Sequence, residues 1–404
     1  MRESIKSFIL LILIVLILGI LLIQGLDIFG VIILPEKYSI KKFINYNNHD
    51  TVTLVSENII SYPKEYYDNK NNSNELEHDP SYSSNEVYNG TGGSLTEYID
   101  QNQVTHNNNN NNGIVIGANN SYYYNQLNTY GKTLYNEMYK NIDNLKTGTY
   151  VIEYGTVFND LLNTPNGEET LTDAFQLSIN AMLLDHPEIF YLDVTKMYMY
   201  TEINKSLIET VYKVSIGPEE GTNYLLSDFP DQASVLIAED ELNTIAYQIT
   251  SHFDGNTYNK IKQAHDYLVE NLKYDEEDNL KKSHSVYGAL IDKLAVCDGY
   301  AKAFKYLLDY MGIHCVQICG TAVNSLNELE NHTWNYVYIE NTWYAVDSTW
   351  DDPIITGGGS LTNDLKYKYF LCGSDKFFSN HTEDGYIVSN GCFAYPVISK
   401  TSYQ

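Results

Sequence analysis

Basic residues are scarce in this sequence. Lysine and arginine together number 25 against 52 aspartates and glutamates, which gives a formal net charge of -27. A nucleic-acid-binding domain carries a basic patch for the phosphate backbone, so we expect no nucleic-acid partner. The acidic excess fits a soluble, exported surface, although charge alone does not identify a partner.

The motifs that commonly hold a structural zinc ion are absent. The 5 cysteines include no CxxC pair, and no two histidines have the His-x-x-x-His spacing, so such a zinc site is not expected. Cys315 and Cys319 lie in a strand-like run, about 13 Å apart in extended backbone, which is too far for a disulfide. Cys372 and Cys392 can pair, and the odd count leaves at least one thiol of an exported protein outside any internal bridge.

A long apolar run opens the chain. Residues 8–23 contain no polar or charged side chain, and Arg2 and Lys6 precede them. A bilayer core takes about 20 helical residues, and this run is long for a signal peptide and lacks a small-residue cleavage site. We predict a cytoplasmic tail at 1–7 and a transmembrane signal anchor at 8–28, hence a single-pass protein of the cell membrane. The positive-inside rule places the rest outside the cytoplasm, although lysines beyond the run weaken this orientation.

Composition and periodicity divide the remainder into three parts. Residues 29–125 include polar runs such as "HNNNNNNG" and bury too little apolar surface to offset the entropy of ordering, so we predict a disordered Asn/Ser-rich tether. Residues 126–230 mix both periodicities and indicate a small α+β accessory domain, with helices expected at 127–145 and 170–188 and strands at 189–200 and 209–217.

The third part, residues 231–404, has helices followed by an antiparallel sheet. The helices are expected at 234–253, 256–274 and 297–311, and the strands at 313–320, 332–340 and 342–350. Helices first and strands afterwards favour an α+β fold in which helices pack on one sheet.

Cys297 begins the central helix of this third part. Apolar residues recur with helical spacing from Tyr300 to Met311, and Gly312 follows where a left-handed C-cap needs glycine. The positive end of the helix dipole favours an anion such as a thiolate. Cysteine is also a common small core residue, so this segment alone leaves core filler and nucleophile as alternatives.

A predicted hairpin places a histidine and an aspartate near each other. With a two-residue turn at Glu340-Asn341, His332 and Asp347 are diagonal neighbours on one sheet face, about 7–8 Å apart at the backbone. A carboxylate there accepts from one imidazole nitrogen and leaves the other for a thiol. A three-residue turn would put the two residues on opposite faces. Singly, His332 can be a histidine packed beside Trp334 and Asp347 a turn residue, but the order cysteine, histidine, aspartate favours a thiol active site.

These segments carry a family resemblance. "AVCDGYAKAFKYLLDYMGI", "NHTWNYVYIENTWYAVDSTWDDP" and "HDYLVENLKYD" resemble the bacterial transglutaminase-like superfamily, and "LLDHPEIFYLD" resembles an upstream element of its exported members. The resemblance implies a papain-like core with Cys297, His332 and Asp347 as the catalytic residues, and neither a metal nor a cofactor. The family includes protein cross-linkers, cysteine peptidases, amidases and members without activity.

Several residues near the predicted triad have a structural alternative. Trp343 and Trp350 flank Asp347 and are expected to shield the His–Asp pair from water, which would strengthen it. The acidic runs at 275–278 and 351–352 lack the spacing of a calcium loop and are expected to be solvated turns. Three residues are weaker candidates. His265 is a helix histidine that we expect to pack in the core. His284 and Tyr287 either line the cleft or belong to a loop.

The sequence therefore predicts an α+β protein with a papain/transglutaminase-like core, a small accessory domain, a tether and one transmembrane helix. The expected function is thiol-dependent acyl transfer outside the cytoplasm on peptide or glutamine carboxamide groups, with transferase, peptidase and amidase left open. The expected partners are the membrane and protein or peptide substrates, such as cell-wall or surface proteins. The alternative is a non-catalytic binding or scaffold module that retains the core.

Overall fold

A computed structural model describes residues 50–52, 121–206, 209–278, 281–353, 361–383 and 393–404. The helices are η2 (Tyr124–Gln126), α4 (Thr129–Lys140), α5 (Ile142–Leu145), α6 (Asn159–Leu162), α7 (Gly167–Asp185), η3 (Val194–Lys196), α8 (Gln232–Thr250), α9 (Thr257–Asn271), η4 (Lys281–His284), η5 (Gly288–Asp292), α10 (Cys297–Tyr310), α11 (Asn363–Lys366) and α12 (Ser374–Phe377). The strands are β1 (Asp50–Val52), β2 (Ile152–Gly155), β3 (Tyr198–Lys205), β4 (Thr210–Gly217), β5 (Lys273–Tyr274), β6 (Leu294–Ala295), β7 (Cys315–Val323), β8 (Leu329–Ile339), β9 (Thr342–Val346) and β10 (His381–Glu383).

The chain divides into two compact units, and the first contains one sheet. This unit comprises residues 1–55, 153–167 and 199–215, and its four strands have the order β1-β3-β4-β2. Val214 in β4 is buried, as the alternating pattern of the predicted strand at 209–217 requires. The helices α4, α5 and nearly all of α7 belong to the second unit, and the predicted domain boundary at residue 230 stays a prediction.

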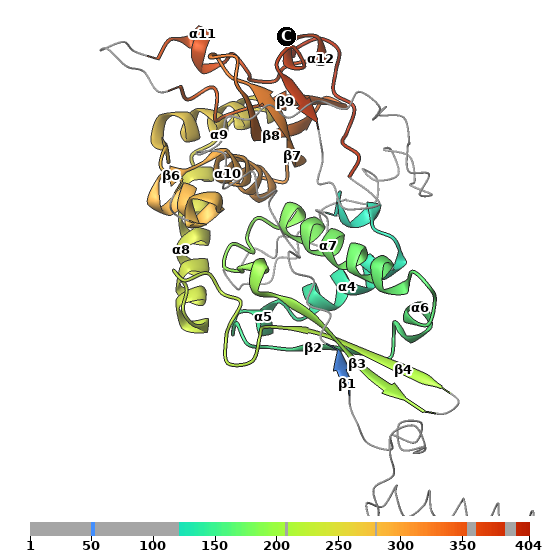
Figure 1. Cartoon of the computed structure of the whole chain (residues 1–404). Helices are drawn as coiled ribbons and strands as arrows, with labels where there is room; N and C mark the ends of the chain where they lie inside the picture. The colour runs from blue at the N-terminus through green and yellow to red at the C-terminus, as the bar shows by residue number, and fades with distance from the viewer. Residues whose placement is uncertain (1–49, 53–120, 207–208, 279–280, 354–360, 384–392) are drawn as a thin grey trace, which may run out of the picture. The chain divides into compact units, whose positions relative to one another are not determined.

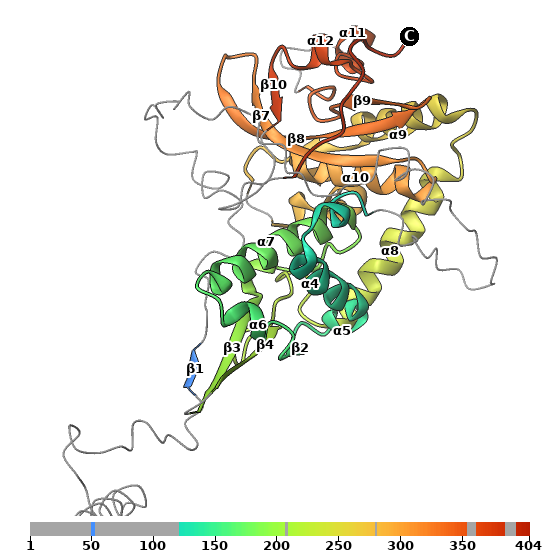
Figure 2. The same ribbon diagram turned by 90° about the vertical axis from the view of Figure 1, so that its right-hand side faces the viewer.

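The second unit, residues 56–152, 168–198 and 216–404, contains the predicted site. Its sheet has the order β10-β7-β8-β9, and each pair of neighbouring strands is antiparallel. The helix α10 packs on β7 and β8, with α8 and α9 packed on α10, and Figures 1 and 2 show α10 along one face of the sheet. This mixed α/β core, with helices on an antiparallel sheet, agrees with the predicted fold class.

The central helix α10 confirms the predicted amphipathic pattern. Tyr300, Phe304 and Leu307 are each fully buried, so the apolar stripe faces the core. The helix ends at Tyr310, and Gly312 follows with a φ of 70°, the left-handed conformation that glycine adopts without strain.

One predicted strand begins later than expected. The run at 189–200 becomes β3 only from Tyr198, because the backbone of residues 191–193 bonds to an irregular segment: the Leu226 N–H donates to the Tyr191 carbonyl at 2.9 Å. A short apolar run does not distinguish a strand from a buried loop by periodicity. The short strands β2 and β10 fall where the sequence predicted none.

Two parts of the predicted tether are described, and both pair with other segments. Asp50–Val52 form β1, which pairs antiparallel with β3. Tyr123 is fully buried, and its backbone N–H and that of Tyr124 donate to the Asp185 carboxylate at 3.0 Å and 2.9 Å. The packed part of the chain therefore includes residues before the predicted boundary at 126.

The predicted membrane segment lies outside the described residues. Within the ranges given above, no helix is long and apolar enough to cross a membrane. The predicted tail at 1–7 and anchor at 8–28 lie outside the described residues, as do most of the tether and Cys392, which the sequence allows to pair with Cys372.

Candidate active site

Cys297 is the first residue of α10, as predicted, and is buried. The approach to the helix is fixed by Val296, whose backbone is extended and whose N–H donates to the Ser283 carbonyl at 3.2 Å. Gly299 lies one residue beyond Asp298 in the first turn, and a Cβ there would overlap the Ser283 carbonyl oxygen. Glycine is therefore required where η4 packs closely against the start of α10.

The β8–β9 hairpin has the predicted two-residue turn. Ile339 pairs with Thr342, and the ladder continues to the pair Asn335–Val346. Glu340 and Asn341 have φ values of 49° and 63°, as a tight hairpin turn with two left-handed residues requires. This register keeps His332 and Asp347 on one face of the sheet, so the geometric premise of the predicted pair is confirmed.

The structure brings the three predicted side chains together. His332 Nε2 donates to Asp347 Oδ2 at 2.8 Å, and His332 also has a side-chain hydrogen bond with Cys297. Because Nε2 is occupied by the carboxylate, the remaining ring nitrogen, Nδ1, serves the thiol. The Asp347 Oδ1 atom accepts from the backbone N–H groups of Thr349 and Trp350, each at 3.1 Å, which fixes the carboxylate in this orientation.

The electrostatics of this pair favour a charged imidazole. Burial lowers the pKa of His332, but the negative charges of Asp347 and of a Cys297 thiolate outweigh burial and raise this pKa to about 10. Burial alone would raise the pKa of Asp347, but the charge of His332 and the hydrogen bonds of the two neighbouring imidazoles hold it well below its usual range. The site therefore stabilises a charged His332 imidazolium beside the Asp347 carboxylate.

Aromatic rings cover the pair, but only one of the two predicted tryptophans contributes. The ring of Trp350 stacks on His332 with a centroid distance of 4.8 Å. Trp343 packs instead on Tyr338 at 5.2 Å, because four residues along a strand separate it from Asp347 by about 13 Å.

Two residues beside the triad were missed by sequence reasoning. His381 of β10 donates from Nε2 to the same Asp347 Oδ2 at 3.2 Å. Tyr274 pairs with Ala295 in the β5–β6 ladder, directly before α10. Tyr274 is 38% exposed, and its partial burial together with the charge of Cys297 raises its pKa above its usual range. His381 belongs to no periodic pattern or local motif. Tyr274 lies in the segment "HDYLVENLKYD" and at the end of the helix predicted at 256–274, but that pattern does not indicate a position beside Cys297.

The weaker candidates lie outside the triad. His265 is fully buried, and its Nε2 is 3.1 Å from Asp351 Oδ2, so it packs as expected but in a polar pair. His284 Nε2 is 2.7 Å from Asp278 Oδ1, beside the start of α10. The Tyr287 hydroxyl donates to a carboxylate of α8 at 2.6 Å.

The acidic runs differ from solvated turns at several positions. Asp351 is fully buried, and its Oδ1 accepts from the Tyr369 N–H at 2.8 Å. Asp352 accepts from the Tyr300 hydroxyl at 2.7 Å. Asp275 is also buried. These carboxylates are therefore parts of the packed core, which the sequence pattern alone did not reveal.

Within the described ranges, one group has the residue types and spacing to hold a metal ion. It consists of His332, Asp347 and His381, whose ligand-type atoms all lie within 4.8 Å of one another. Both imidazoles already donate to the carboxylate, and an ion there would take the His332 nitrogen that faces Asp347. We treat the three residues as a hydrogen-bonded cluster, and the expected absence of a metal stays a prediction.

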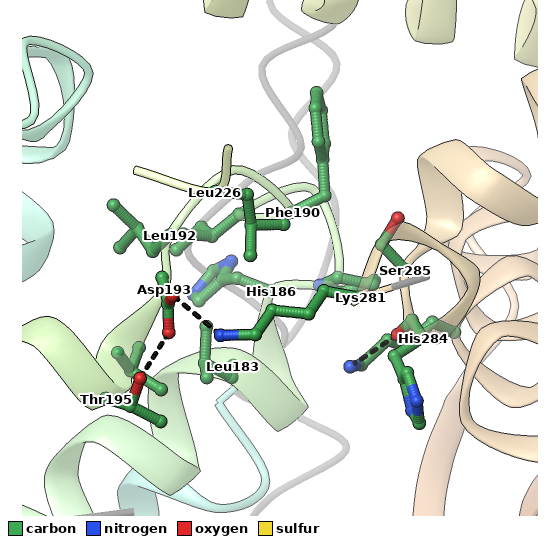
Figure 3. Close-up of a pocket in the computed structure, with 14 residues that line it drawn as sticks. Leu183, His186, Phe190, Leu192, Asp193, Thr195, Leu226, Lys281, His284 and Ser285 are labelled. Carbon is green, nitrogen blue, oxygen red and sulfur yellow. Dashed lines mark hydrogen bonds and ion pairs between the residues drawn. The ribbon is translucent and has the colours of Figure 1, made fainter. Parts of the chain in front are cut away.

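A cavity lies elsewhere in the second unit, between the loop after α7 and η4. Apolar side chains such as Phe190 and Leu192 line most of it. The Lys281 ammonium donates to the Asp193 carboxylate at 2.9 Å, and Figure 3 shows these two side chains pointing toward each other. Lys302 donates to the His284 carbonyl at 2.9 Å on the other side. None of the triad residues lines this cavity.

The geometry agrees with a comparison against known families. Residues 243–348, which include all three triad positions, match the Transglutaminase-like superfamily. This part of the chain is a transglutaminase-like superfamily domain.

Two mammalian relatives share part of this region. The chain is 28% identical over 129 residues to kyphoscoliosis peptidase of Mus musculus, a match that covers 29% of this chain and 20% of the mouse protein. It is 31% identical over 96 residues to kyphoscoliosis peptidase of Homo sapiens, which covers 22% of this chain and 14% of the human protein. The match therefore spans about a fifth or less of the length of these relatives.

Two solved structures are also similar. A crystal structure of a TGase aligns over 44% of this chain and 50% of its own, with 11% identity and a TM-score of 0.28. A structure assigned as a cysteine protease from Cytophaga hutchinsonii aligns over 35% of this chain and 52% of its own, with 17% identity and a TM-score of 0.24. Similarity at this level carries no argument about chemistry, which rests on the site itself.

Proposed function

We propose that this protein is a thiol-dependent acyl-transfer enzyme in which Cys297 is the nucleophile, His332 the general base and acid, and Asp347 the orienting group. The observation that carries the proposal is the position of His332 between a cysteine at a helix start and a buried carboxylate. A nucleophile, a base that activates it and a group that orients the base are the parts that covalent acyl transfer requires.

The residues divide the reaction into two steps. In the first, the Cys297 sulfur attacks a carbonyl carbon, the C–N bond breaks, and the leaving ammonia or amine takes its proton from the His332 imidazolium. In the second, water or an amine attacks the thioester while His332 accepts its proton, and the C–S bond breaks to restore the cysteine. The N–H of Cys297, in the first turn of α10, is the donor that we assign to the developing oxyanion.

The substrate class that we propose is a peptide or glutamine carboxamide on a protein. Transferase, peptidase and amidase reactions share the same thioester and differ in what leaves and in which nucleophile resolves it. The two mammalian relatives are named peptidases, which supports the peptide carbonyl as one substrate.

We propose further that the enzyme acts outside the cytoplasm, anchored by residues 8–28. The support is the uncharged run at 8–23, preceded by Arg2 and Lys6. The substrates would then be cell-surface or cell-wall proteins within reach of the anchored domain.

The activity is tested by offering a glutamine-containing protein, a labelled primary amine and water together. Amine incorporation identifies a transferase, backbone cleavage a peptidase, and ammonia release alone an amidase. The Cys297→Ala variant, which loses only a sulfur, should give none of the three. Absence of all three reactions, together with equal labelling of every cysteine by a thiol-directed electrophile at neutral pH, would favour a non-catalytic binding module.

A further inference from the structure

A second histidine shares the carboxylate that orients His332. The Nε2 atoms of His332 and His381 lie 2.8 Å and 3.2 Å from the same oxygen, Asp347 Oδ2. The other carboxylate oxygen accepts two backbone N–H groups at 3.1 Å, so Asp347 accepts four hydrogen bonds in all. A buried carboxylate that accepts several hydrogen bonds is stabilised in its ionised form.

The position of His381 results from the strand order. β10 is the edge strand beside β7, and His381 pairs with Ala322 while His332 of β8 pairs with Gly320 of β7. This register puts both histidines on one face of the sheet, with ring centroids 5.7 Å apart. A Cβ at Gly320 would lie 2.6 Å from a ring carbon of Trp334, so the glycine leaves room for that indole beside His381.

His381 is enclosed, so it does not reach a substrate. Its exposed fraction is 1%, and its ring stacks on Phe377 at 4.0 Å and meets the rings of Trp334 and Trp350 at 5.1 Å and 4.8 Å. His381 donates to Asp347 Oδ2, the atom that orients His332. It can therefore influence the reaction only through Asp347.

The groups that face His381 come from four segments. Asp347 follows β9 and His332 lies in β8, and these two are the charged groups that act on it. The Tyr369 ring is 5.2 Å away, and the Asn380 side-chain oxygen lies 3.0 Å from Nδ1. Burial lowers the pKa of His381, while the Asp347 carboxylate that its Nε2 faces acts in the opposite direction.

We propose that His381 is a positioning residue that keeps the Asp347 carboxylate ionised and aimed at His332, an inference that rests on the proposed function of the triad. Hydrogen bonds to an ionised group are roughly twice as strong as those between neutral groups, so loss of this donor should be measurable. Without it, Asp347 takes up a proton at a higher pH, His332 loses its charged partner, and the proton returns from the imidazolium to Cys297. The reactive form of the thiol then disappears earlier on acidification.

The experiment measures the rate at which iodoacetamide alkylates Cys297 as a function of pH, by mass spectrometry of the cysteine-containing peptide. The full chain in detergent is compared with three variants, and circular dichroism melts are recorded at each pH. His381→Phe keeps an aromatic ring but removes the donor, whereas His381→Gln can place an amide N–H near the position of Nε2. His314→Phe is the matched control, because His314 is half-buried and directly precedes β7, at the end away from the residues that pair with β10.

We expect the acid-side midpoint of alkylation to rise by about one pH unit in His381→Phe, which corresponds to about 1.4 kcal/mol. His381→Gln should restore most of the shift, and His314→Phe should leave the midpoint unchanged. If His381→Phe does not fold, His381→Asn replaces it, because the shorter amide does not reach Asp347 from the same backbone position.

Three results would overturn the inference. The first two are an unchanged acid-side midpoint of alkylation in His381→Phe and an equal loss of alkylation rate at every pH. The third is one equivalent of zinc in the purified protein, because the histidines would then be metal ligands. The first two leave the reactive cysteine and its base in place and so spare the proposed function, whereas bound zinc would occupy His332 and Asp347 and would also exclude their assigned roles. Wild-type protein whose Cys297 reacts no faster than its other cysteines would instead overturn both.

Discussion

Replacing Asp347 by asparagine tests the proposed site most directly. The carboxylate accepts two backbone N–H groups on one oxygen and two imidazole N–H groups on the other. An asparagine has one acceptor oxygen, so its NH2 group must face donors on one side. If it faces His332, the ring must carry its proton on Nδ1, the nitrogen that serves the thiol, and the base is lost.

The structure sets the expected size of the effect. The pKa of His332 rises from 6.5 to about 10, which corresponds to about 5 kcal/mol at ~1.36 kcal/mol for each pKa unit. If Asp347 supplies about half of this energy, its loss costs the imidazolium about 2–3 kcal/mol. We therefore expect Asp347→Asn to slow both turnover and Cys297 alkylation at neutral pH by about 10²-fold.

Asp351 offers a matched control for this substitution. Both aspartates are fully buried and both face a histidine, since Asp351 Oδ2 lies 3.1 Å from His265 Nε2. His265 lies outside the triad, so Asp351→Asn should change the melting temperature while leaving the alkylation rate of folded protein within about threefold. Equal alkylation rates in wild type and Asp347→Asn, with both proteins folded, would refute the assigned role of Asp347.

The same substitution should alter how stability depends on pH. The pKa of Asp347 is depressed by folding, so its stabilisation is present above its ordinary value of about 3.9 and is lost as pH falls further. The pKa of His332 is raised, so its stabilisation is complete below about 6.5 and is lost as pH rises towards about 10. The difference in unfolding free energy between wild type and Asp347→Asn should therefore be greatest between about pH 4 and pH 6.5, and a difference independent of pH would contradict the linkage.

Three further predictions concern the nucleophile, the helix start and the topology. Cys297→Ala should abolish turnover without changing the melting temperature, and His332→Ala should lower the rate by about 10²–10⁴-fold. The double variant should have the same rate as Cys297→Ala alone. Retained activity in Cys297→Ala would show that another residue is the nucleophile. Gly299→Ala should destabilise the fold by about 1–3 kcal/mol in chemical denaturation and slow Cys297 alkylation, because the new Cβ would overlap the Ser283 carbonyl oxygen. An unchanged denaturation midpoint would mean that η4 moves away from α10 at no energetic cost. Protease added to intact cells should release the folded region, and full protection in cells whose envelope admits the protease would place that region inside.

Much of the site could be predicted because each piece has a local signal. The first turn of α10 follows from a 3.6-residue pattern that ends at Gly312, and Cys297 stands at its start. The turn at Glu340-Asn341 fixes the register of β8 and β9, and a period of two then decides that His332 and Asp347 share a face.

The packing of the N-terminal part was less predictable. Low-complexity composition did not predict η2, which begins directly after Tyr123, and it could not show that the Asp185 carboxylate at the end of α7 accepts a hydrogen bond from the Tyr123 backbone. The Asp185 side chain is separated from Tyr123 by 62 positions along the chain. Composition measures the average tendency to bury surface, whereas a single buried hydrogen-bonding group can order a short polar segment.

Only the tertiary structure decided what surrounds the triad. His381 is 34 residues beyond Asp347, in a segment with no periodic pattern, and reaches the carboxylate because β10 pairs with β7. Tyr274 lies close enough to feel the charge of Cys297 because β5 pairs with β6. Side-chain periodicity and turn chemistry act between residues a few positions apart and are therefore visible in the sequence. The order of strands in a sheet depends on which distant segments bury their surfaces together, and that choice is made by the packing of the whole unit.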